Sequence, residues 1–372
     1  MFDPFKRARK KATRRLRRTA VSAMTDAWNS MLVPTMPTKR KAKKVVKSSA
    51  SARKSAGKTS PAQPAVKSNL PATSRSKMIV PRGAAFTSGT FESLHGTRSY
   101  KLYVPAAAKK TAVPLPLIVM LHGCGQTPDD FARGTGMNTL AEEFGFLVLY
   151  PAQSRNAHRN RCWNWFKRED QTRGAGEPAL FADLTRRIIA EQDIDPAKVY
   201  VAGLSAGASA AIIVATAYPD IFAGVGVHSG LAVGAAHDAT SAARAMQGGS
   251  PGVRHEAPLP TVIFHGDADK VVNPRNGRFV AIRAQEAFSD LDRSERTGRV
   301  VGGREFTRIL HRVGKGRAYI EQWVIRGSGH AWSGGHSAGS YTDPAGPDAS
   351  REMVRFFLTH RTTKKRRSTP PV

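Results

Sequence analysis

Short apolar runs alternate with stretches of helical periodicity through most of the chain, from about residue 98 to residue 358. Residues 115–121 (LPLIVML) are apolar almost throughout, which is typical of a strand buried on both faces of a sheet. Residues 181–191 instead place Leu184, Ile188 and Ile189 on one side, which predicts an amphipathic helix. The same patterns predict further strands at residues 98–104, 146–150, 199–202, 222–227, 261–264 and 318–325, and further helices at residues 128–144, 208–217 and 347–358.

The order of these elements indicates a protein of the α/β class. Strands that are separated by helices usually pair in parallel, so we predict a mainly parallel sheet with helices on both faces. Residues 98–104 are an exception, because their alternation of polar and apolar positions favours an early antiparallel strand. The chain has no apolar run of about 18 residues, so no membrane-spanning helix is predicted.

The charge is concentrated at the two ends of the chain. The 372 residues include 58 Lys and Arg against 28 Asp and Glu, a formal net charge of +30. Residues 1–82 contain 22 of the basic residues and two acidic ones, and residues 361–372 contain five basic residues. We therefore divide the chain into a basic tail (1–82), a mildly basic domain (83–360) and a second basic tail (361–372). Because the excess charge lies in the tails, it predicts no specific nucleic-acid partner.

Both tails are predicted to be mostly disordered, with one helix in the first. Residues 39–77 are rich in Lys, Ser, Ala, Pro and Thr and contain too few large apolar side chains to form a core. In residues 5–32, Val21, Met24 and Trp28 recur at helical spacing, which predicts a basic amphipathic helix suited to an anionic surface or a polymer granule. A tail that only solubilises the protein is the alternative. No apolar segment follows the basic start, so a cleavable signal peptide is not predicted.

The sequence around Ser205 is the strongest chemical signal. Gly203-Leu204-Ser205-Ala206-Gly207 lies directly between a predicted strand and a predicted helix. This is the context of a nucleophile elbow, a sharp turn that exposes the serine hydroxyl at the carboxyl edge of the sheet. Glycines two positions before and after the serine allow the strand and the helix to approach closely. We therefore expect Ser205 to be a nucleophile.

A serine nucleophile needs a histidine base and a carboxylate that orients the base. In this architecture the acid follows the serine in the chain. The predicted strand 261–264 runs into a loop with two acidic residues, of which we choose Asp269 as the acid and keep Asp267 as the alternative. The alternative for either carboxylate is a purely structural role, as a turn-former or a helix cap.

The base is expected after a later strand. His330 lies in the glycine-flanked loop that follows the predicted strand 318–325, and it is our candidate. His336 is near in sequence but lacks this position. His122 and His265 open two other loops, and we expect them to hold those loops by hydrogen bonds.

A reaction in which a serine attacks a carbonyl carbon also needs amide donors for the developing oxyanion. We expect one from Ala206, the residue after the nucleophile, and one from Cys124 in the loop after the strand 115–121. Cys124 and Cys162 are the two cysteines of the chain, and each lies in a loop after a predicted strand. The sequence leaves two alternatives for these cysteines: they form a disulfide, or they are two buried thiols. Neither cysteine has the spacing of a metal site, and no metal or organic cofactor is expected.

Six segments together resemble the polyhydroxybutyrate (PHB) depolymerase family of esterases, in the α/β-hydrolase superfamily. The resemblance covers about residues 83–360. The segments are LHGCGQTPDDFA (121–132), RCWNWF (161–166), GLSAGASAA (203–211), HGDADKVVNPRN (265–276), GSGHAWSGG (327–335) and YTDPAGPDASREMVRFF (341–357).

The resemblance implies an α/β-hydrolase fold and a polyester or small ester as substrate. It implies Ser205, Asp269 and His330 as the catalytic triad, with Cys124 as an oxyanion contributor. It also implies a Cys124–Cys162 link. It further places three neighbouring residues near the substrate groove, although they are equally well explained as core residues: Trp163, Asn164 and Trp165.

Three readings of the function follow. The favoured one is a serine esterase that cleaves short-chain polyhydroxyalkanoate or its oligomers. Feruloyl and acetylxylan esterases share much of the pattern and are the alternative among enzymes. From another class, the alternative is a polyanion- or granule-binding protein that acts through its tail and carries a vestigial hydrolase domain. The family is usually extracellular, and the basic start without a signal keeps a cytoplasmic location as the alternative.

Overall fold

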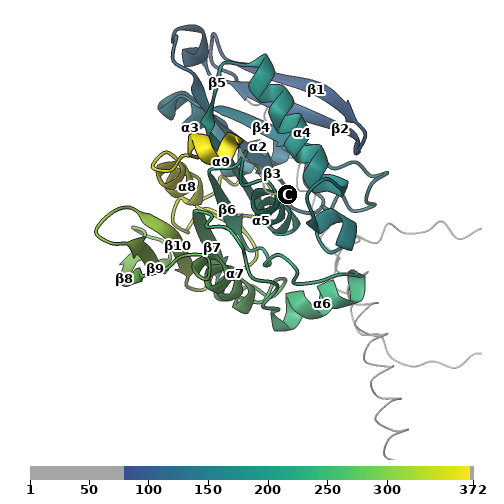
Figure 1. Cartoon of the computed structure of the whole chain (residues 1–372). Coiled ribbons are helices and arrows are strands. Elements are labelled where there is room, and N and C mark those ends of the chain that lie inside the picture. The colour runs from purple at the N-terminus through teal and green to yellow at the C-terminus, as the bar shows by residue number, and fades with distance from the viewer. Residues whose placement is uncertain (1–78, 369–372) are drawn as a thin grey trace, which may run out of the picture. The chain divides into compact units, whose positions relative to one another are not determined.

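The computed structural model describes residues 79–368, which contain one large sheet covered by helices (Figure 1). The sheet has ten strands. They are β1 (Ala85–Ser93), β2 (Gly96–Val104), β3 (Leu115–Leu121), β4 (Leu147–Pro151), β5 (Ile194–Leu204), β6 (Gly224–His228), β7 (Thr261–Gly266), β8 (Leu291–Arg299), β9 (Glu305–Val313) and β10 (Ala318–Ile325).

The strand order is β1-β2-β4-β3-β5-β6-β7-β10-β9-β8. The central strands, from β4 to β10 in this order, all pair in parallel. The strands β1 and β2 at one end and β9 and β8 at the other are antiparallel (Figure 1). The mainly parallel sheet is confirmed, and so is the early antiparallel strand at residues 98–104, which is part of β2.

The helices divide between the two faces of the sheet. Their bounds are α2 (Pro128–Thr135), α3 (Met137–Phe144), α4 (Gly176–Glu191), α5 (Ala206–Ala217), α6 (Ala239–Gly248), α7 (Arg275–Gln285), α8 (Ala349–Phe357) and α9 (Lys364–Ser368). Two 3₁₀ turns, at Ala106–Lys109 and Arg168–Gln171, and a short parallel pair, β11 (Trp332–Ser333) and β12 (Thr342–Asp343), complete the fold.

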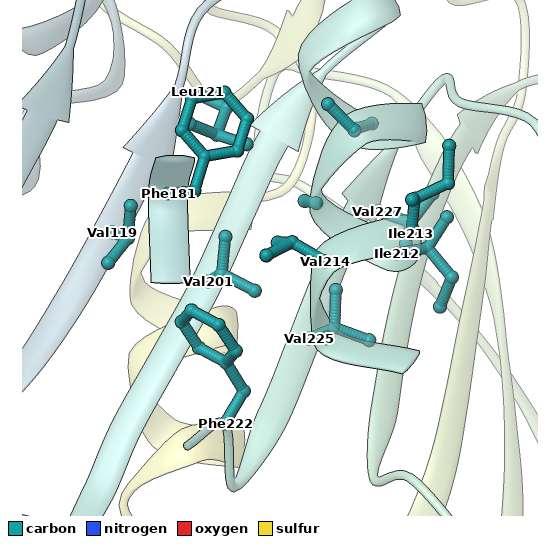
Figure 2. Close-up of a cluster of buried hydrophobic side chains, with 14 of the residues drawn as sticks. Val119, Leu121, Phe181, Val201, Ile212, Ile213, Val214, Phe222, Val225 and Val227 are labelled. Carbon is teal, nitrogen blue, oxygen red and sulfur yellow. The ribbon is translucent and has the colours of Figure 1, made fainter. Parts of the chain in front are cut away.

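Alternate residues of each central strand enter two separate cores. In β3, Val119 and Leu121 face a core shared with α4, α5, α6 and α7, whereas Ile118 and Met120 face a core shared with α2, α3 and α8. Figure 2 shows the first core, where Ile212 and neighbouring residues of α5 lie against the strands. This period of two across a sheet that is buried on both faces explains why its strands are continuous apolar runs.

Several elements differ from the predictions. The predicted helix 128–144 is two helices, because Gly136 adopts a left-handed backbone (φ 63°) that ends α2. The strands β1, β8 and β9 were not predicted. Their sequences are polar, and β8 alone contains Asp292, Arg293, Glu295 and Arg296 at exposed positions. Charged side chains are common on strands at the edge of a sheet, where one side of the backbone is unpaired.

The end of the described chain corrects the prediction of a disordered tail from residue 361. Thr362 is buried, and its amide donates a hydrogen bond of 2.9 Å to the carbonyl of Ala197. This contact holds the following helix, α9, beside the domain, so the basic side chains begin on an ordered segment. The predicted tail 1–82, with its helix at 5–32, lies almost wholly outside the described residues. None of the helices within residues 79–368 is long and apolar enough to cross a membrane.

Candidate active site

Ser205 lies in a strained turn between β5 and α5. Its backbone has φ 57° and ψ −120°, a conformation that residues with a side chain rarely adopt. The turn is held on both sides, because the Ser205 amide donates to the carbonyl of His228 (2.9 Å) and the Ser205 carbonyl accepts from the amide of Ser209 (3.0 Å). The Ser205 side chain is half-buried.

Two glycines make this turn sterically feasible. A Cβ atom added to Gly207 would lie 2.0 Å from the carbonyl oxygen of Leu121 in β3. A Cβ atom added to Gly203 would lie 2.4 Å from the backbone of Gly207. Real Cβ atoms do not approach so closely, so the spacing of the two glycines around Ser205 is required by backbone packing.

Asp269 and His330 come together at the carboxyl edge of the sheet. They follow β7 and β10, which are neighbours and parallel, so the two loops leave the sheet side by side. Nδ1 of His330 donates a hydrogen bond of 2.7 Å to Oδ2 of Asp269. The other carboxylate oxygen, Oδ1, accepts the amides of Val271 and Val272, both at 2.9 Å. The Asp269 side chain has no exposed surface.

These contacts keep the Asp269 carboxylate ionised. Burial acts to raise the pKa of Asp269, but hydrogen bonds from His265, His330 and the Val272 amide outweigh burial and hold the pKa well below its ordinary value. A buried negative charge therefore lies against Nδ1 of His330, where it fixes the tautomer of the ring. Asp267 is exposed and accepts the amide of Gly327 at 2.7 Å, so it braces the start of the His330 loop.

His122 and His265 hold loops, as predicted. Nδ1 of His122 donates to the Gly123 carbonyl (2.8 Å) and Nε2 accepts the Gln153 amide (3.1 Å). Burial lowers the pKa of His122 to about 4, which keeps the ring neutral. Nε2 of His265 donates to the carbonyl of Val272 (2.9 Å) and so closes the turn that presents Asp269.

The loop after β3 presents the amide of Cys124 between two amides that are already bonded. The Gly123 amide donates to Oε1 of Gln126 (2.9 Å), and the Gly125 amide donates to the Asn160 carbonyl (2.8 Å). Within residues 79–368, neither the Cys124 amide nor the Ala206 amide donates a hydrogen bond to another group. Ala206 is the first residue of α5, where helix amides lack intrahelical partners.

A disulfide joins Cys124 to Cys162, with an S–S distance of 2.08 Å. It connects the loop after β3 to the loop after β4. The second loop is anchored by the buried carboxylate of Glu177, which accepts the amide of Asn164 at 2.7 Å. Arg98 adds a charged contact to the same carboxylate at 3.0 Å. The loop that carries Cys124 is therefore covalently tied to an anchored neighbour.

The expected groove residues lie in the interior. Trp163 has no exposed surface, its indole N–H donates to the His122 carbonyl (2.8 Å), and its ring packs edge-on against Phe181. The side-chain amide of Asn164 donates a hydrogen bond to the carboxylate of Glu177. Trp165 is 6% exposed, and its ring packs edge-on against Phe166. All three side chains are therefore buried within the domain, and their position near a substrate groove stays a prediction. Their contacts support the disulfide loop.

One residue of the site, His228, was not singled out from the sequence. It is the last residue of β6, has no exposed surface, and accepts the Ser205 amide through its carbonyl. Its position directly after a predicted strand was the available signal, because the carboxyl ends of parallel strands gather at one edge. Within the described part of the chain, no three His, Cys, Asp or Glu side chains are grouped closely enough to hold a metal ion.

Comparison with known proteins places these features in a family. A family model described as "Esterase PHB depolymerase" matches residues 98–300. Poly(3-hydroxyalkanoate) depolymerase C of Paucimonas lemoignei is 33% identical over 245 residues, which are 61% of this chain and 57% of that protein. Poly(3-hydroxybutyrate) depolymerase of Ralstonia pickettii is 37% identical over 122 residues, 31% of this chain and 25% of that protein. The chain thus spans only part of the length of these relatives.

Other related proteins align with this chain over more of their own length. Feruloyl esterase B of Neurospora crassa is 29% identical over 276 residues, 68% of this chain and 86% of that protein. The solved structure of an acetyl xylan esterase from Aspergillus awamori covers 74% of this chain and 98% of its own, at 20% identity and a TM-score of 0.55. This structural likeness concerns the fold, and with the strand order it identifies an α/β-hydrolase fold. The family match covers more than half of the chain, so the protein belongs to the PHB depolymerase family of esterases.

Proposed function

We propose that the protein hydrolyses carboxylic esters through an acyl-serine intermediate. The observation that carries this proposal is the 2.7 Å hydrogen bond from Nδ1 of His330 to the buried, ionised carboxylate of Asp269. With its Nδ1 proton donated to Asp269, the ring keeps the lone pair of Nε2 for a serine proton. Ser205, in a strained turn at the same edge of the sheet, is the serine that we assign to this base.

In the acylation step, Nε2 of His330 takes the hydroxyl proton of Ser205 as its Oγ attacks the ester carbonyl carbon. The carbonyl π bond breaks and its electrons become an oxyanion. The amides of Cys124 and Ala206 are the donors we assign to this oxyanion, because no other group in the described chain accepts from them. When the tetrahedral intermediate collapses, His330 returns the proton to the departing alcohol.

In the deacylation step, water takes the place of the alcohol. His330 removes a proton from the water while the water oxygen attacks the acyl carbon. When this second intermediate collapses, its bond to Oγ breaks, His330 returns the proton to Oγ of Ser205, and the acid is released. Asp269 stabilises the imidazolium in both steps without taking the proton itself. No step requires a metal or an organic cofactor.

The substrate that we favour is a short-chain polyhydroxyalkanoate, poly-3-hydroxybutyrate in particular, or its soluble oligomers. The family match and two relatives named as depolymerases support this choice. The alternative is a feruloyl or acetylated xylan ester, which is supported by the alignment to 86% of the length of a feruloyl esterase.

An activity screen tests the function and the substrate together. Full-length protein and Ser205→Ala are assayed on p-nitrophenyl butyrate, hydroxybutyrate oligomers, polymer film, feruloyl esters and acetylated xylan, and both are treated with a fluorophosphonate probe. We expect oligomer hydrolysis and probe labelling by the wild type alone. Labelling of Ser205→Ala at the same rate would contradict the assigned nucleophile, and faster turnover of feruloyl or acetylxylan esters would select the alternative substrate.

We further propose that the protein acts outside the cytoplasm and that its basic N-terminal tail adsorbs it to anionic surfaces or granules. The disulfide supports the first point, because such bonds persist in oxidising compartments. The 22 basic residues of the first 82 support the second. If the screen detects no ester turnover, the result would favour the alternative of a protein that binds through its tail and carries an inactive hydrolase domain.

A further inference from the structure

His228 occupies the centre of the candidate site without contributing to the proposed chemistry. It ends β6, whose neighbours in the sheet are β5, which leads to Ser205, and β7, which leads to Asp269. Its side chain has no exposed surface. The imidazole is stacked on Phe264 (5.8 Å between ring centres) and on Trp332 (5.0 Å), two residues after His330.

Hydrogen bonds at its two ends connect His228 to two different parts of the site. Its carbonyl oxygen accepts the Ser205 amide at 2.9 Å, which holds the nucleophile turn. Its ring nitrogen Nε2 accepts the Ser333 amide at 3.0 Å, which holds the loop that carries His330. One residue therefore joins the backbone of the nucleophile to the loop of the base.

The contacts also define the protonation state that this bridge needs. Nε2 accepts a hydrogen bond, so the ring proton is on Nδ1, which faces Oγ of Ser229 at 3.2 Å. Burial, together with the nearby His265 and His330 and against the opposing charge of Asp269, lowers the pKa of His228 to about 3. The ring is therefore neutral at every pH at which an esterase works, and it serves as an acceptor and a stacking surface.

We propose that His228 is a positioning residue that sets the distance between Ser205 and His330. This inference rests on the proposed function, because it concerns the same serine and histidine. Reacting groups in an enzyme must be held to within about 0.5 Å, and a misplacement of about 1 Å costs roughly 100-fold in rate. Loss of the Nε2 acceptor leaves the buried Ser333 amide without its partner, and the loop of His330 then shifts relative to the elbow.

Three substitutions separate the acceptor from the rest of the side chain. In His228→Leu the acceptor is absent. In His228→Gln an amide oxygen takes the approximate place of Nε2, whereas in His228→Asn the shorter amide does not reach Ser333. The matched control is His255→Leu. His255 is also a buried histidine, but its two ring nitrogens have no hydrogen-bond partner within the described residues, so its replacement removes no acceptor in use.

The experiment measures kcat and KM on p-nitrophenyl butyrate, the rate of fluorophosphonate labelling and the melting temperature of the full-length variants. We expect His228→Leu and His228→Asn to lower kcat and the labelling rate by about 10- to 100-fold, with KM within about threefold of the wild type. We expect His228→Gln to recover most of the loss and His255→Leu to leave kcat unchanged.

The possible outcomes separate this inference from the function on which it rests. If the wild type neither turns over esters nor labels at Ser205, the proposed function fails. If the wild type is active and His228→Leu or His228→Asn keeps its kcat, the positioning role is overturned. Equal losses in His228→Gln and His228→Asn would also overturn it, since the acceptor would then have no part. The Gln and Asn pair decides the question even if the leucine variant does not fold.

Discussion

At the scale of single residues, Asp267 and Asp269 differ in their partners and not in their chemistry. Both follow β7, two positions apart, and the sequence favoured Asp269 without excluding Asp267. In the folded chain only Asp269 accepts Nδ1 of His330, and only Asp269 lacks exposed surface. Asp267 instead accepts a hydrogen bond from the Gly327 amide, which gives its carboxylate a structural role at the start of the loop that carries His330.

A pair of isosteric substitutions tests this difference. We expect Asp269→Asn to lower kcat by roughly 10³–10⁴-fold, because an amide does not stabilise the imidazolium and favours the wrong tautomer of His330. Asp267→Asn keeps an oxygen for the Gly327 amide and is expected to lower kcat less than tenfold. Steady-state kinetics on p-nitrophenyl butyrate measures both, and the opposite ranking would transfer the role of the acid to Asp267.

At the scale of elements, the site is an assembly of loops that leave the carboxyl ends of parallel strands. The turn after β5 is fixed by its own glycines, whereas the loop after β3 depends on partners from elsewhere. Gln126 bonds the Gly123 amide and also reaches Ser340 at 3.0 Å, beyond the loop of His330. The Cys124–Cys162 disulfide ties the same loop to the loop after β4.

Removal of this disulfide is expected to weaken both stability and catalysis. The bonded cysteines are 38 residues apart, for which the chain-entropy model gives a stabilisation of about 3–4 kcal/mol. The double substitution Cys124→Ser with Cys162→Ser should lower the free energy of unfolding in urea by about that amount and lower kcat, because the Cys124 position loses its anchor.

The control for this prediction is wild-type protein with and without reductant. Its intact mass should rise by two hydrogens on reduction, and the reduced form should resemble the double variant in urea. Complete alkylation of both cysteines in unreduced, denatured protein would contradict the bond. Unchanged kcat in the double variant would show that the loop after β3 is held without it.

At the scale of the whole molecule, buried histidines make the fold sensitive to acid. Burial lowers the pKa of His122, His255 and His360 to about 4 and that of His228 to about 3. The unfolded chain protonates these rings near pH 6.5, so between pH 6.5 and 4 it binds more protons than the folded chain, and stability falls as the pH falls. The lowered pKa of Asp269 acts in the same direction below its ordinary value.

We expect urea denaturation to reveal this loss as about 1 kcal/mol for each of these histidines between pH 7.5 and pH 5.5. His255→Leu removes one of the four and leaves the proposed site intact. Its free energy of unfolding should therefore fall less steeply over this range than that of the wild type. Parallel pH dependences for the two proteins would mean that His255 is not protonated on unfolding.

The basic N-terminal tail is expected to affect adsorption and not turnover. Deletion of residues 1–78 removes most of the net charge and none of the residues of the candidate site. The kcat on p-nitrophenyl butyrate should stay within about twofold. Co-sedimentation with polymer granules and anionic vesicles should weaken, and for the full chain it should decrease with salt, because exposed charges are screened over about 8–10 Å.

Equal co-sedimentation of the two proteins would show that the tail is not an anchor. Binding by the full chain that survives high salt would instead support the amphipathic helix predicted at residues 5–32, because an apolar face does not depend on screening. A collapse of kcat after deletion would place part of the tail in the catalytic domain and would move the predicted boundary.

The sequence by itself determined the features that depend on neighbouring residues. The central strands are continuous apolar runs because both faces of a parallel sheet are covered, and the turn at Ser205 is marked by two glycines because Gly207 approaches Leu121 so closely. The expected order of serine, acid and histidine can also be read from the chain alone, and the six motif segments carried the resemblance to the family to which the protein belongs.

Only the tertiary structure decided the features that depend on contacts between distant segments. The hydrogen bond between Asp269 and His330 spans 61 residues, and the bond from the Ser333 amide to His228 spans 105, so no local pattern predicts either contact. The family resemblance placed Trp163 near the substrate groove, and its complete burial against Phe181 is a contact that the sequence does not show, because aromatic side chains suit both a core and a binding surface. The strands β8 and β9 form because β9 pairs with β10 and β8 pairs with β9, which satisfies their backbone hydrogen bonds, and the side-chain pattern of these strands does not indicate this pairing.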